Sequence, residues 1–259
     1  MTPKIAAQYS LNCLDLTSLN LTDTEEDIDI LCRHAQTAYG ETAAVCVWPK
    51  FTKQAVTLLK DTDIKVAAVA NFPDGGTDTD QALAACKQII DAGGDEIDLV
   101  FPYRALLRGD ADAAKQVITS CKNLCDDTLT LKVILETGEL KSTDHIKSAS
   151  EIALAAGADF IKTSTGKTEI SATLEAAETM LHTIKAYGKG AFKASGGIKD
   201  VSTATSYLHL AQKIMGEEWI NPQHFRFGAS GILEDILNTL SDQRNTPEQQ
   251  PKRVHSDPY

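Results

Sequence analysis

Two lysines, Lys162 and Lys193, each follow a short apolar run and precede small residues and glycine. Such runs are typical of strands, so both amines are predicted at the buried C-terminal tips of strands. Burial of an ammonium group is costly, and two lysines at equivalent positions of successive strands are expected to lower each other's pKa. A neutral amine in a water-poor pocket is the nucleophile that Schiff-base formation with a carbonyl compound requires.

Other polar side chains lie within or at the ends of predicted strands. Asp98 and Lys132 interrupt two apolar runs, Asp15 and Thr17 end the first predicted strand, and Cys46 lies in the second. Unpaired buried charge is costly and side chains alternate along a strand, so Asp98 is predicted to face an interior where it meets a lysine. A structural ion pair explains this pattern as well as a catalytic carboxylate does.

Small residues cluster after the last three predicted strands. They are Gly166, Gly196, Gly197, Gly228, Ser230 and Gly231, with Lys167 beside the first. Small residues let backbone N–H groups converge on an anion, and the N-terminus of a following helix favours negative charge. Turn formation alone explains any one cluster, but three in succession favour a phosphate site, because many barrels bind phosphate in their last loops.

Strand-like and helix-like segments alternate along the chain, which places it in the α/β class. The predicted strands are Cys13–Thr17, Ala43–Trp48, Lys65–Ala70, Glu96–Phe101, Thr130–Leu135, Phe160–Thr163, Ala191–Ala194 and Phe225–Gly228. Helical periodicity is clearest over Glu25–Tyr39, Asp80–Gly93, Leu174–Tyr187, Val201–Met215 and Ile232–Leu240. Eight strands in a chain of this length favour a (β/α)₈ TIM barrel over an open doubly wound sheet. The absence of Gly-x-Gly-x-x-Gly counts against a dinucleotide-binding domain.

One domain over residues 1–240 accounts for all the periodic segments. Residues 241–259 are polar and contain three prolines, which predicts a mobile C-terminal tail. Tyr259 at its end could fold back over a pocket mouth or remain in solvent, as chain ends commonly do.

Composition narrows the class of function. The formal net charge of −11 argues against binding to nucleic acid or an anionic membrane, although a few local amides and lysines can still bind one phosphate. The chain has six cysteines without a C-x-x-C motif, no signal-like N-terminus and no long apolar stretch, so a cytoplasmic protein is expected. Cys121 and Cys125 are expected to pack as small hydrophobes. The histidines are dispersed, so no metal site is predicted, and the absence of Gly-x-Ser-x-Gly disfavours serine hydrolysis.

Five long motifs together resemble the 2-deoxyribose-5-phosphate aldolases, a family of class I aldolases. The motifs are EIDLVFPYR at 96–104, ETGEL at 136–140, FIKTSTG at 160–166, FKASGG at 192–197 and FRFGAS at 225–230. The resemblance extends from Asp15 to Ser230, and one branch of that family also ends in tyrosine, as this chain does at Tyr259.

The resemblance implies a barrel that reversibly cleaves 2-deoxy-D-ribose 5-phosphate to acetaldehyde and D-glyceraldehyde 3-phosphate in deoxyribose catabolism. It implies that Lys162 is the Schiff-base lysine, Lys193 the second lysine and Asp98 the proton-relay carboxylate. It further assigns Asp15, Thr17, Cys46, Lys132 and Thr165 to the substrate pocket, and Gly166, Lys167, Gly196, Gly197, Gly228, Ser230 and Gly231 to the phosphate site. The family often has two serines where this chain has Ser230 and Gly231, so one hydroxyl donor is lost.

The resemblance also implies partners and excludes others. Phosphorylated sugar and small aldehydes are the expected ligands, without a metal or organic cofactor, and barrels of this family are often homodimers. Three alternatives remain open from the residues alone: another Schiff-base barrel such as a transaldolase or keto-acid aldolase, a phosphosugar isomerase, and a catalytically silent phosphosugar-binding barrel. Trapping of a covalent imine separates the first from the other two.

Overall fold

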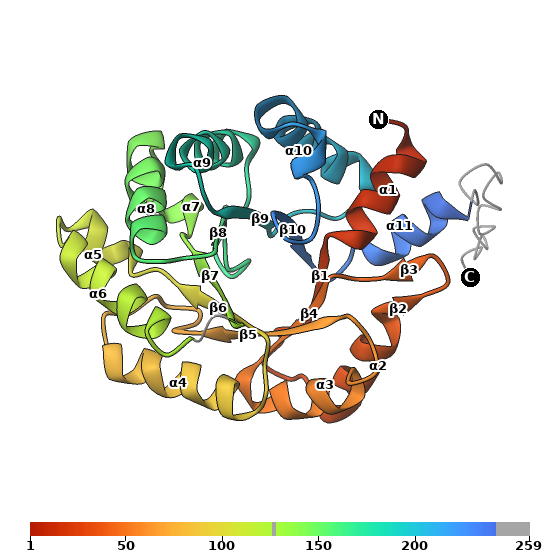
Figure 1. The fold of residues 1–259 in the computed structure, drawn as a ribbon, viewed down its shortest axis with the longest axis horizontal. Helices are drawn as coiled ribbons and strands as arrows, with labels where there is room; N and C mark the ends of the chain where they lie inside the picture. The colour runs from red at the N-terminus through yellow and green to blue at the C-terminus, as the bar shows by residue number, and fades with distance from the viewer. Residues whose placement is uncertain (126–127, 242–259) are drawn as a thin grey trace, which may run out of the picture.

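A closed barrel of eight parallel strands forms the centre of the computed structural model, which describes residues 1–125 and 128–241 (Figure 1). The barrel strands are β1 (Leu14–Thr17), β4 (Ala44–Val47), β5 (Lys65–Ala70), β6 (Glu96–Val100), β7 (Thr130–Ile134), β8 (Phe160–Lys162), β9 (Ala191–Ser195) and β10 (Phe225–Ala229). Each strand pairs with the next one along the chain, and β10 pairs with β1. The predicted (β/α)₈ barrel is therefore confirmed, and the open sheet is excluded.

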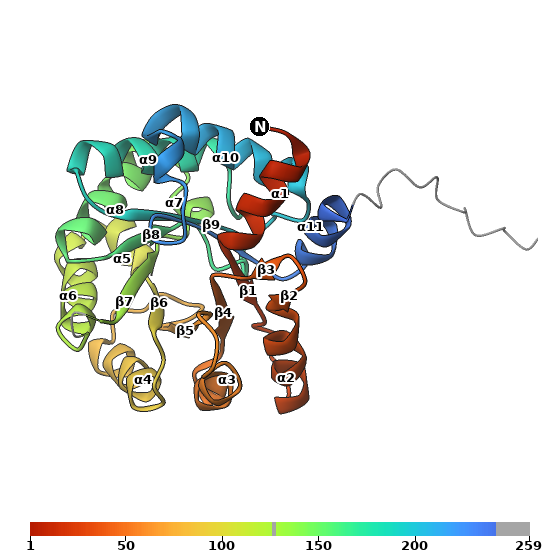
Figure 2. The same cartoon turned by 45° about the vertical axis from the view of Figure 1, so that its right-hand side comes forward.

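Helices form a layer outside the strands (Figures 1 and 2). They are α1 (Pro3–Asn12), α2 (Glu25–His34), α3 (Thr52–Leu58), α4 (Thr79–Asp91), α5 (Tyr103–Leu107), α6 (Ala111–Lys122), α7 (Thr137–Leu140), α8 (Thr143–Ala155), α9 (Leu174–Tyr187), α10 (Val201–Met215) and α11 (Leu233–Leu240), with 3₁₀ turns η1 (Pro49–Phe51) and η2 (Glu217–Trp219). This arrangement directs the carboxyl ends of all eight strands to one face of the barrel.

Local side chains fix where the helices begin and end. The Ala176 N–H donates to Thr173 Oγ1 at the start of α9, and Gly188 ends that helix in the left-handed region. At the start of α2, Thr24 and Asp27 form a reciprocal capping box. Such caps satisfy backbone groups that have no partner within the helix. These caps fix the first turns of α2 and α9, the helices that follow strands β1 and β8.

The structure differs from the sequence prediction at α1 and around the end of α2. Helix α2 ends at His34, five residues before the predicted end, and a small hairpin of β2 (Gln36–Thr37) and β3 (Gly40–Glu41) follows. The helix prediction was therefore wrong beyond His34. Within the hairpin, Gly40 has φ 124°, a conformation that L side chains rarely adopt. Helix α1 was not predicted; it lies beside α10 and α11 (Figures 1 and 2).

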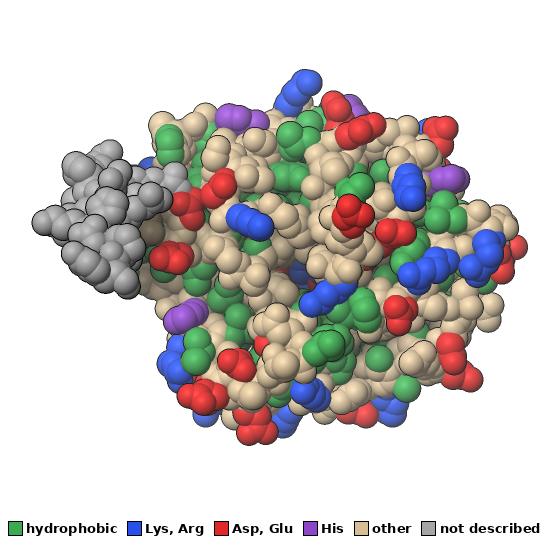
Figure 3. Space-filling view, turned by 180° about the vertical axis from the view of Figure 1, so that it is seen from behind, with side chains coloured by type: hydrophobic (Ala, Val, Ile, Leu, Met, Phe, Trp, Pro, Cys, Tyr) green, Lys and Arg blue, Asp and Glu red, His purple; other side chains and the backbone are tan. Residues whose placement is uncertain are grey.

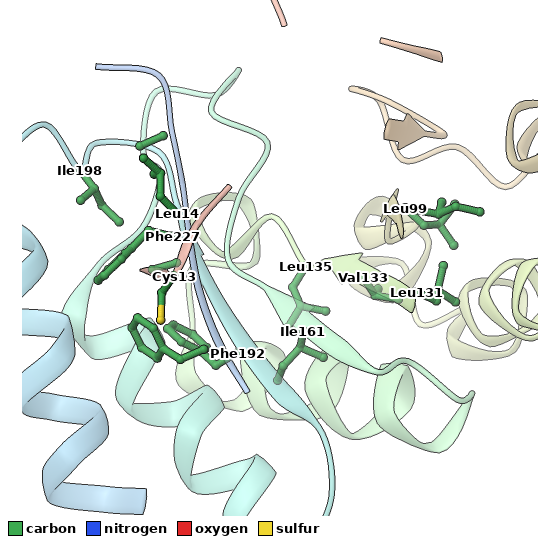
Figure 4. Packing of buried hydrophobic residues seen from close by; sticks show 14 of the residues in the cluster. Cys13, Leu14, Leu99, Leu131, Val133, Leu135, Ile161, Phe192, Ile198 and Phe227 are labelled. Carbon is green, nitrogen blue, oxygen red and sulfur yellow. The ribbon is translucent and has the colours of Figure 1, made fainter. Parts of the chain in front are cut away.

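The barrel strands separate an apolar layer from a polar one. On β7, Leu131 and Val133 belong to the hydrophobic core between barrel and helices, whereas Lys132 between them points to the barrel interior. Figure 4 shows Leu131 and Val133 near Leu99 of β6. Because side chains alternate along a strand, a strand that packs helices on one face presents every second residue to the interior.

The predicted tail falls outside the described residues, except for Ser241 directly after α11. The division into 1–240 and 241–259 stays a prediction. Within 1–125 and 128–241, no helix is both long and apolar enough to cross a membrane. Acidic and basic side chains are intermixed on the face that Figure 3 shows.

Candidate active site

Ionisable side chains fill one layer inside the barrel. They are Asp15 of β1, Glu96 and Asp98 of β6, Lys132 of β7, Lys162 of β8, Lys193 of β9 and Arg226 of β10, and all are buried. Strand register places them side by side: Asp98 is opposite Lys132, and Lys193 is opposite both Lys162 and Arg226. The prediction that Asp98 faces an interior containing lysine is confirmed.

Asp98 accepts hydrogen bonds from three lysines. Its Oδ2 lies 2.8 Å from Lys162 Nζ and 2.7 Å from Lys193 Nζ, and its Oδ1 lies 2.8 Å from Lys132 Nζ. Burial by itself would raise the pKa of Asp98, but the neighbouring lysines, Lys132 first among them, hold it well below its usual range. Asp98 is therefore a carboxylate at neutral pH.

The two predicted key lysines have opposite pKa shifts. Burial lowers the pKa of Lys162, and the neighbouring Lys193 adds to this effect while Asp98 opposes it. Burial also acts against the ammonium form of Lys193, but Asp15 at 2.5 Å and Asp98 outweigh it and raise the pKa of Lys193. The expected effect of one lysine on the other is confirmed at Lys162, whereas the net pKa of Lys193 is raised because carboxylates flank it on two sides.

The predicted pocket residues of the first strands lie around this layer. Cys46 is fully buried with Sγ 3.9 Å from Asp98 Oδ2, and burial raises the pKa of its thiol to about 11. Thr17 donates its hydroxyl to the Asp15 carbonyl at the carboxyl end of β1. Burial opposes ionisation of Asp15, but Lys193 and Arg226 hold the pKa of Asp15 below its ordinary value. Lys132 is enclosed completely.

Glu136 organises the loop after β8. This buried residue has φ 58°, in the left-handed region that is uncommon for non-glycine residues. Its carboxylate accepts hydrogen bonds from the hydroxyls of Thr165 (2.5 Å) and Thr168 (3.2 Å). Thr165 Oγ1 in turn accepts from the Lys167 N–H at 3.0 Å. Burial raises the pKa of Glu136.

A cavity of about 430 Å³ opens between the loops after β8, β9 and β10. All the predicted phosphate residues line it, together with Thr17 and Thr165: Gly166, Lys167, Gly196, Gly197, Gly228, Ser230 and Gly231. The Lys167 ammonium donates to the Leu19 carbonyl at 2.8 Å and so joins two sides of the cavity. A larger cavity of about 910 Å³ shares Thr17, Ser230 and Gly231 but extends along α2 and α11. The smaller cavity fits an anion better, because Lys167, Lys199 and several glycines line it.

Two glycines permit this geometry. A Cβ at Gly228 would lie 2.9 Å from Lys193 Cε and 2.6 Å from Ser195 Oγ, so only glycine lets Lys193 pass beneath the cavity wall. Gly196 has φ 86°, and a Cβ there would lie 2.5 Å from Ser171 Cβ. The cavity therefore borders the lysine layer directly.

The structure adds four residues that were not assigned from the sequence. Glu96 and Arg226 belong to the charged layer, Glu136 holds the β8 loop, and Lys199 lines the cavity. Glu96 had a detectable signal, because it lies two residues before Asp98 and must share its face of β6. Arg226 had a similar signal as a charge within an apolar run.

Two further predictions concern residues away from this layer. Tyr259 lies outside the described residues, so its predicted contribution is untested. Cys121 is buried in the hydrophobic core, as expected, and Cys125 follows the end of α6. Among residues 1–125 and 128–241, no group of three or more His, Cys, Asp and Glu side chains has the geometry to hold a metal ion.

A barrel with a buried, low-pKa lysine beside a carboxylate and an anion-sized cavity has the features of a Schiff-base enzyme of the TIM-barrel class. The family model for DeoC/LacD family aldolases matches residues 9–231. The chain belongs to this aldolase family.

Individual relatives agree with the family. Over 241 residues the chain is 49% identical to a deoxyribose-phosphate aldolase of Agrobacterium fabrum, covering 92% of this chain and 93% of the relative. A solved structure from Coccidioides immitis, of a protein proposed to be a deoxyribose-phosphate aldolase, is 30% identical with a TM-score of 0.80, covering 90% of this chain and 86% of that one. The fold of deoxyribose phosphate aldolase from Aeropyrum pernix is also shared, at 24% identity and a TM-score of 0.74, covering 94% and 93% of the two chains.

Proposed function

We propose that this aldolase reversibly cleaves 2-deoxy-D-ribose 5-phosphate to acetaldehyde and D-glyceraldehyde 3-phosphate, a step of deoxyribose breakdown. The observation that carries the proposal is the buried amine of Lys162, 2.8 Å from Asp98, in a charged layer whose Lys193 lies under Gly228 of the cavity wall. The 49% identical relative bears the same activity in its name.

Lys162 is the nucleophile in this proposal. Its neutral amine attacks C1 of the open-chain sugar, and loss of water from the carbinolamine gives a protonated imine. Burial and Lys193 lower the pKa of Lys162 from its ordinary value, which increases the fraction of free amine near neutral pH. The iminium cation then accepts the electrons of the bond that breaks.

Asp98 and Lys193 serve proton transfer. Lys193 Nζ and Lys162 Nζ both contact Asp98 Oδ2. The ionised Asp98 accepts the proton of the C3 hydroxyl, which is relayed through a water and Lys193. The C2–C3 bond then breaks. D-glyceraldehyde 3-phosphate departs, and an enamine remains on Lys162. The ammonium of Lys193, which donates to Asp98 Oδ2, returns a proton to the enamine carbon in this proposal. Hydrolysis then frees acetaldehyde and the Lys162 amine.

The cavity loops hold the phosphate. Gly166, Gly196 and Gly197 line the cavity and leave room for an anion, and Lys167 and Lys199 add positive charge. The helix α11 begins shortly after Ser230 and Gly231 on the same wall. Binding energy from the phosphate fixes the sugar, and this remote binding can lower the barrier at the reacting carbon. Asp15, Thr17, Cys46, Lys132 and Thr165 complete the pocket and its charged floor in this proposal.

Reductive trapping tests the nucleophile. Wild-type protein is treated with 2-deoxy-D-ribose 5-phosphate or acetaldehyde and borohydride, and the modified peptide is located by mass spectrometry. We expect one stable adduct on Lys162, and Lys162→Met should not form it. An adduct on another residue would remove Lys162 from this role. Product analysis with acetaldehyde distinguishes this activity from those of a transaldolase or keto-acid aldolase.

Assembly and location belong to the same proposal. We expect a homodimer, measurable by sedimentation at micromolar concentration, and a cytoplasmic location, measurable by cell fractionation. Phosphorylated sugar and small aldehydes are the proposed ligands, without nucleic acid.

A further inference from the structure

The charged layer contains a closed ring of alternating cations and carboxylates. Lys193 bridges Asp15 (2.5 Å) and Asp98 (2.7 Å), and Lys132 bridges Asp98 (2.8 Å) and Glu96 (2.5 Å). Arg226 closes the ring, because it contacts Glu96 at 2.9 Å and Asp15 at 2.6 Å. Each of these three cations thus lies between two carboxylates of the ring, and Lys132 also lies 3.7 Å from the third, Asp15. The ring is neutral when all six groups are ionised.

Lys162 is the fourth basic side chain of the layer and lies outside this ring. Its carboxylate contact is with Asp98, at an oxygen that already accepts a hydrogen bond from Lys193. A fourth ammonium group would give a buried layer with an excess positive charge, which is costly in a medium of low polarity. The neutral amine avoids that cost.

The contacts of Arg226 and Glu96 are with ring members, of which Lys162 is not one, and with the surrounding barrel. The Arg226 guanidinium also donates to the Pro222 carbonyl at 2.5 Å, and its Cζ lies 5.6 Å from the centre of the Phe160 ring. Burial opposes the charge on Arg226, but Asp15 and Glu96 raise the pKa of Arg226 further, so it stays charged. Glu96 contacts Lys132 and Arg226.

We propose that Arg226 and Glu96 are positioning residues that keep the ring neutral and thereby keep Lys162 a free amine. They act through Asp15, Asp98 and the ring lysines. This inference rests on the proposed role of Lys162 as the imine-forming lysine. It assigns a catalytic purpose to a pair that would otherwise be a structural ion pair.

The titratable and charged groups that surround Lys162 come from several elements. They are Asp15 of β1, Cys46 of β4, Asp98 of β6, Lys132 of β7, Glu136 after β7 and Lys193 of β9. Cys46 stays a neutral thiol, because burial raises its pKa to about 11. The Glu136 carboxyl is held by Thr165 and Thr168 outside the ring. None of these groups is altered in the test below, so ring charge is the only variable.

Substitutions that remove one charge from the ring should shift the pH dependence of imine formation in opposite directions, and combining them should cancel the shift. Arg226→Gln removes one cation, which favours the ammonium form of Lys162, so the acid limb of imine formation should move to higher pH. Glu96→Gln removes one carboxylate and should move that limb to lower pH. Each shift is expected to be on the order of one pH unit, because a full charge within a buried layer has about that effect. The double variant restores neutrality and should return the limb near that of wild type.

The measured quantity is the rate of adduct formation at Lys162 with acetaldehyde and cyanoborohydride, followed by mass spectrometry from pH 5 to 9. Arg226→Lys retains the charge and should keep the wild-type limb, even if it binds Glu96 less well. Asp91→Asn breaks the exposed Lys87–Asp91 pair of α4 and should leave the limb unmoved. Circular dichroism establishes that each variant is folded, and if Arg226→Gln does not fold, the isosteric Glu96→Gln is decisive by itself.

The outcomes separate the two proposals. The proposed role of the ring is supported if the acid limb of the pH–rate profile shifts in opposite directions in the two single variants and returns to the wild-type position in the double variant. Limbs that stay in place, or that move in the same direction in both single variants, overturn it while Lys162 remains the trapped lysine. A wild-type protein that forms no adduct at Lys162 overturns the proposed function itself.

Discussion

Asp98 has two oxygens and three lysine donors, and this imbalance explains how the site divides its charge. Lys193 and Lys132 each reach a second carboxylate, whereas Lys162 shares an already occupied oxygen of Asp98. The consequence is one lysine with a lowered pKa beside another with a raised pKa. Residues of identical type thus receive opposite roles from their neighbours.

Removal of the second lysine should reveal this division. We expect Lys193→Leu to reduce kcat by about 100-fold or more, because a positioned proton donor is lost. Loss of this cation also removes repulsion at Lys162, so the pKa of Lys162 should rise and the acid limb of kcat/KM should move to higher pH. Steady-state kinetics across pH measure both effects. The exposed Lys189→Leu is the matched control, and an unmoved limb in Lys193→Leu would contradict the coupling.

Loops rather than strands supply the binding half of the site. The predicted phosphate residues come together because β8, β9 and β10 are neighbours in the barrel and end at the same face. Glu136 fixes the first of these loops through Thr165, whose hydroxyl also receives the Lys167 N–H. A loop held in this way can present its backbone to an anion without the entropic cost of ordering it at each binding event.

A glycine substitution tests the loop after β9. Gly196→Ala would place a Cβ 2.5 Å from Ser171 Cβ, so the loop must shift and the wall of the cavity must change shape. We expect KM for 2-deoxy-D-ribose 5-phosphate to rise about tenfold or more, since hydrogen bonds to a charged group are lost. The rate with unphosphorylated 2-deoxy-D-ribose should change little.

Gly188→Ala is the control for this experiment. Gly188 also has a positive φ, 80°, but it ends α9 and a Cβ there meets nothing within 4 Å. It carries the same kind of backbone strain without the collision and should leave KM unchanged. Equal losses with the phosphorylated and unphosphorylated sugars in Gly196→Ala would show that the loop does not bind phosphate.

At the scale of the whole molecule, the charged ring joins strands from all around the barrel. Asp15 of β1, Asp98 of β6 and Arg226 of β10 are far apart in the chain but share one layer of contacts. Breaking one partner of a buried pair leaves an uncompensated charge, which is strongly destabilising. Protonation of the buried carboxylates at low pH should therefore lower the free energy of unfolding.

Stability should fall with acid in a defined window. The pKa values of Asp15 and Asp98 lie below their ordinary values in the folded state, so their contribution is present above about pH 4 and is lost as pH falls through the folded-state pKa. Urea unfolding between pH 2 and 7 measures the free energy of unfolding. Asp98→Asn should weaken this pH dependence, because one of the responsible groups is gone. An equal slope in the variant and the wild type would exclude Asp98 as a source.

Local patterns determine much of this protein. Short apolar runs separated by helical periodicity define all eight strands to within one residue at each end, because the strand pattern is local. The same alternation places Asp98 and Lys132 inside the barrel. The end of α2 was overestimated, because the hairpin at Gly40 depends on pairing that periodicity does not reveal.

The sequence by itself determined the strands, the barrel and the identity of the two lysines, because these follow from residue type and spacing along the chain. Only the tertiary structure decided which lysine has a lowered pKa and which a raised one, that Arg226 and Glu96 close a neutral ring, and that Glu136 holds the β8 loop. The reason is that a pKa and a charge balance depend on distances between side chains from different strands. Those distances exist only when β1 and β10 have closed the barrel.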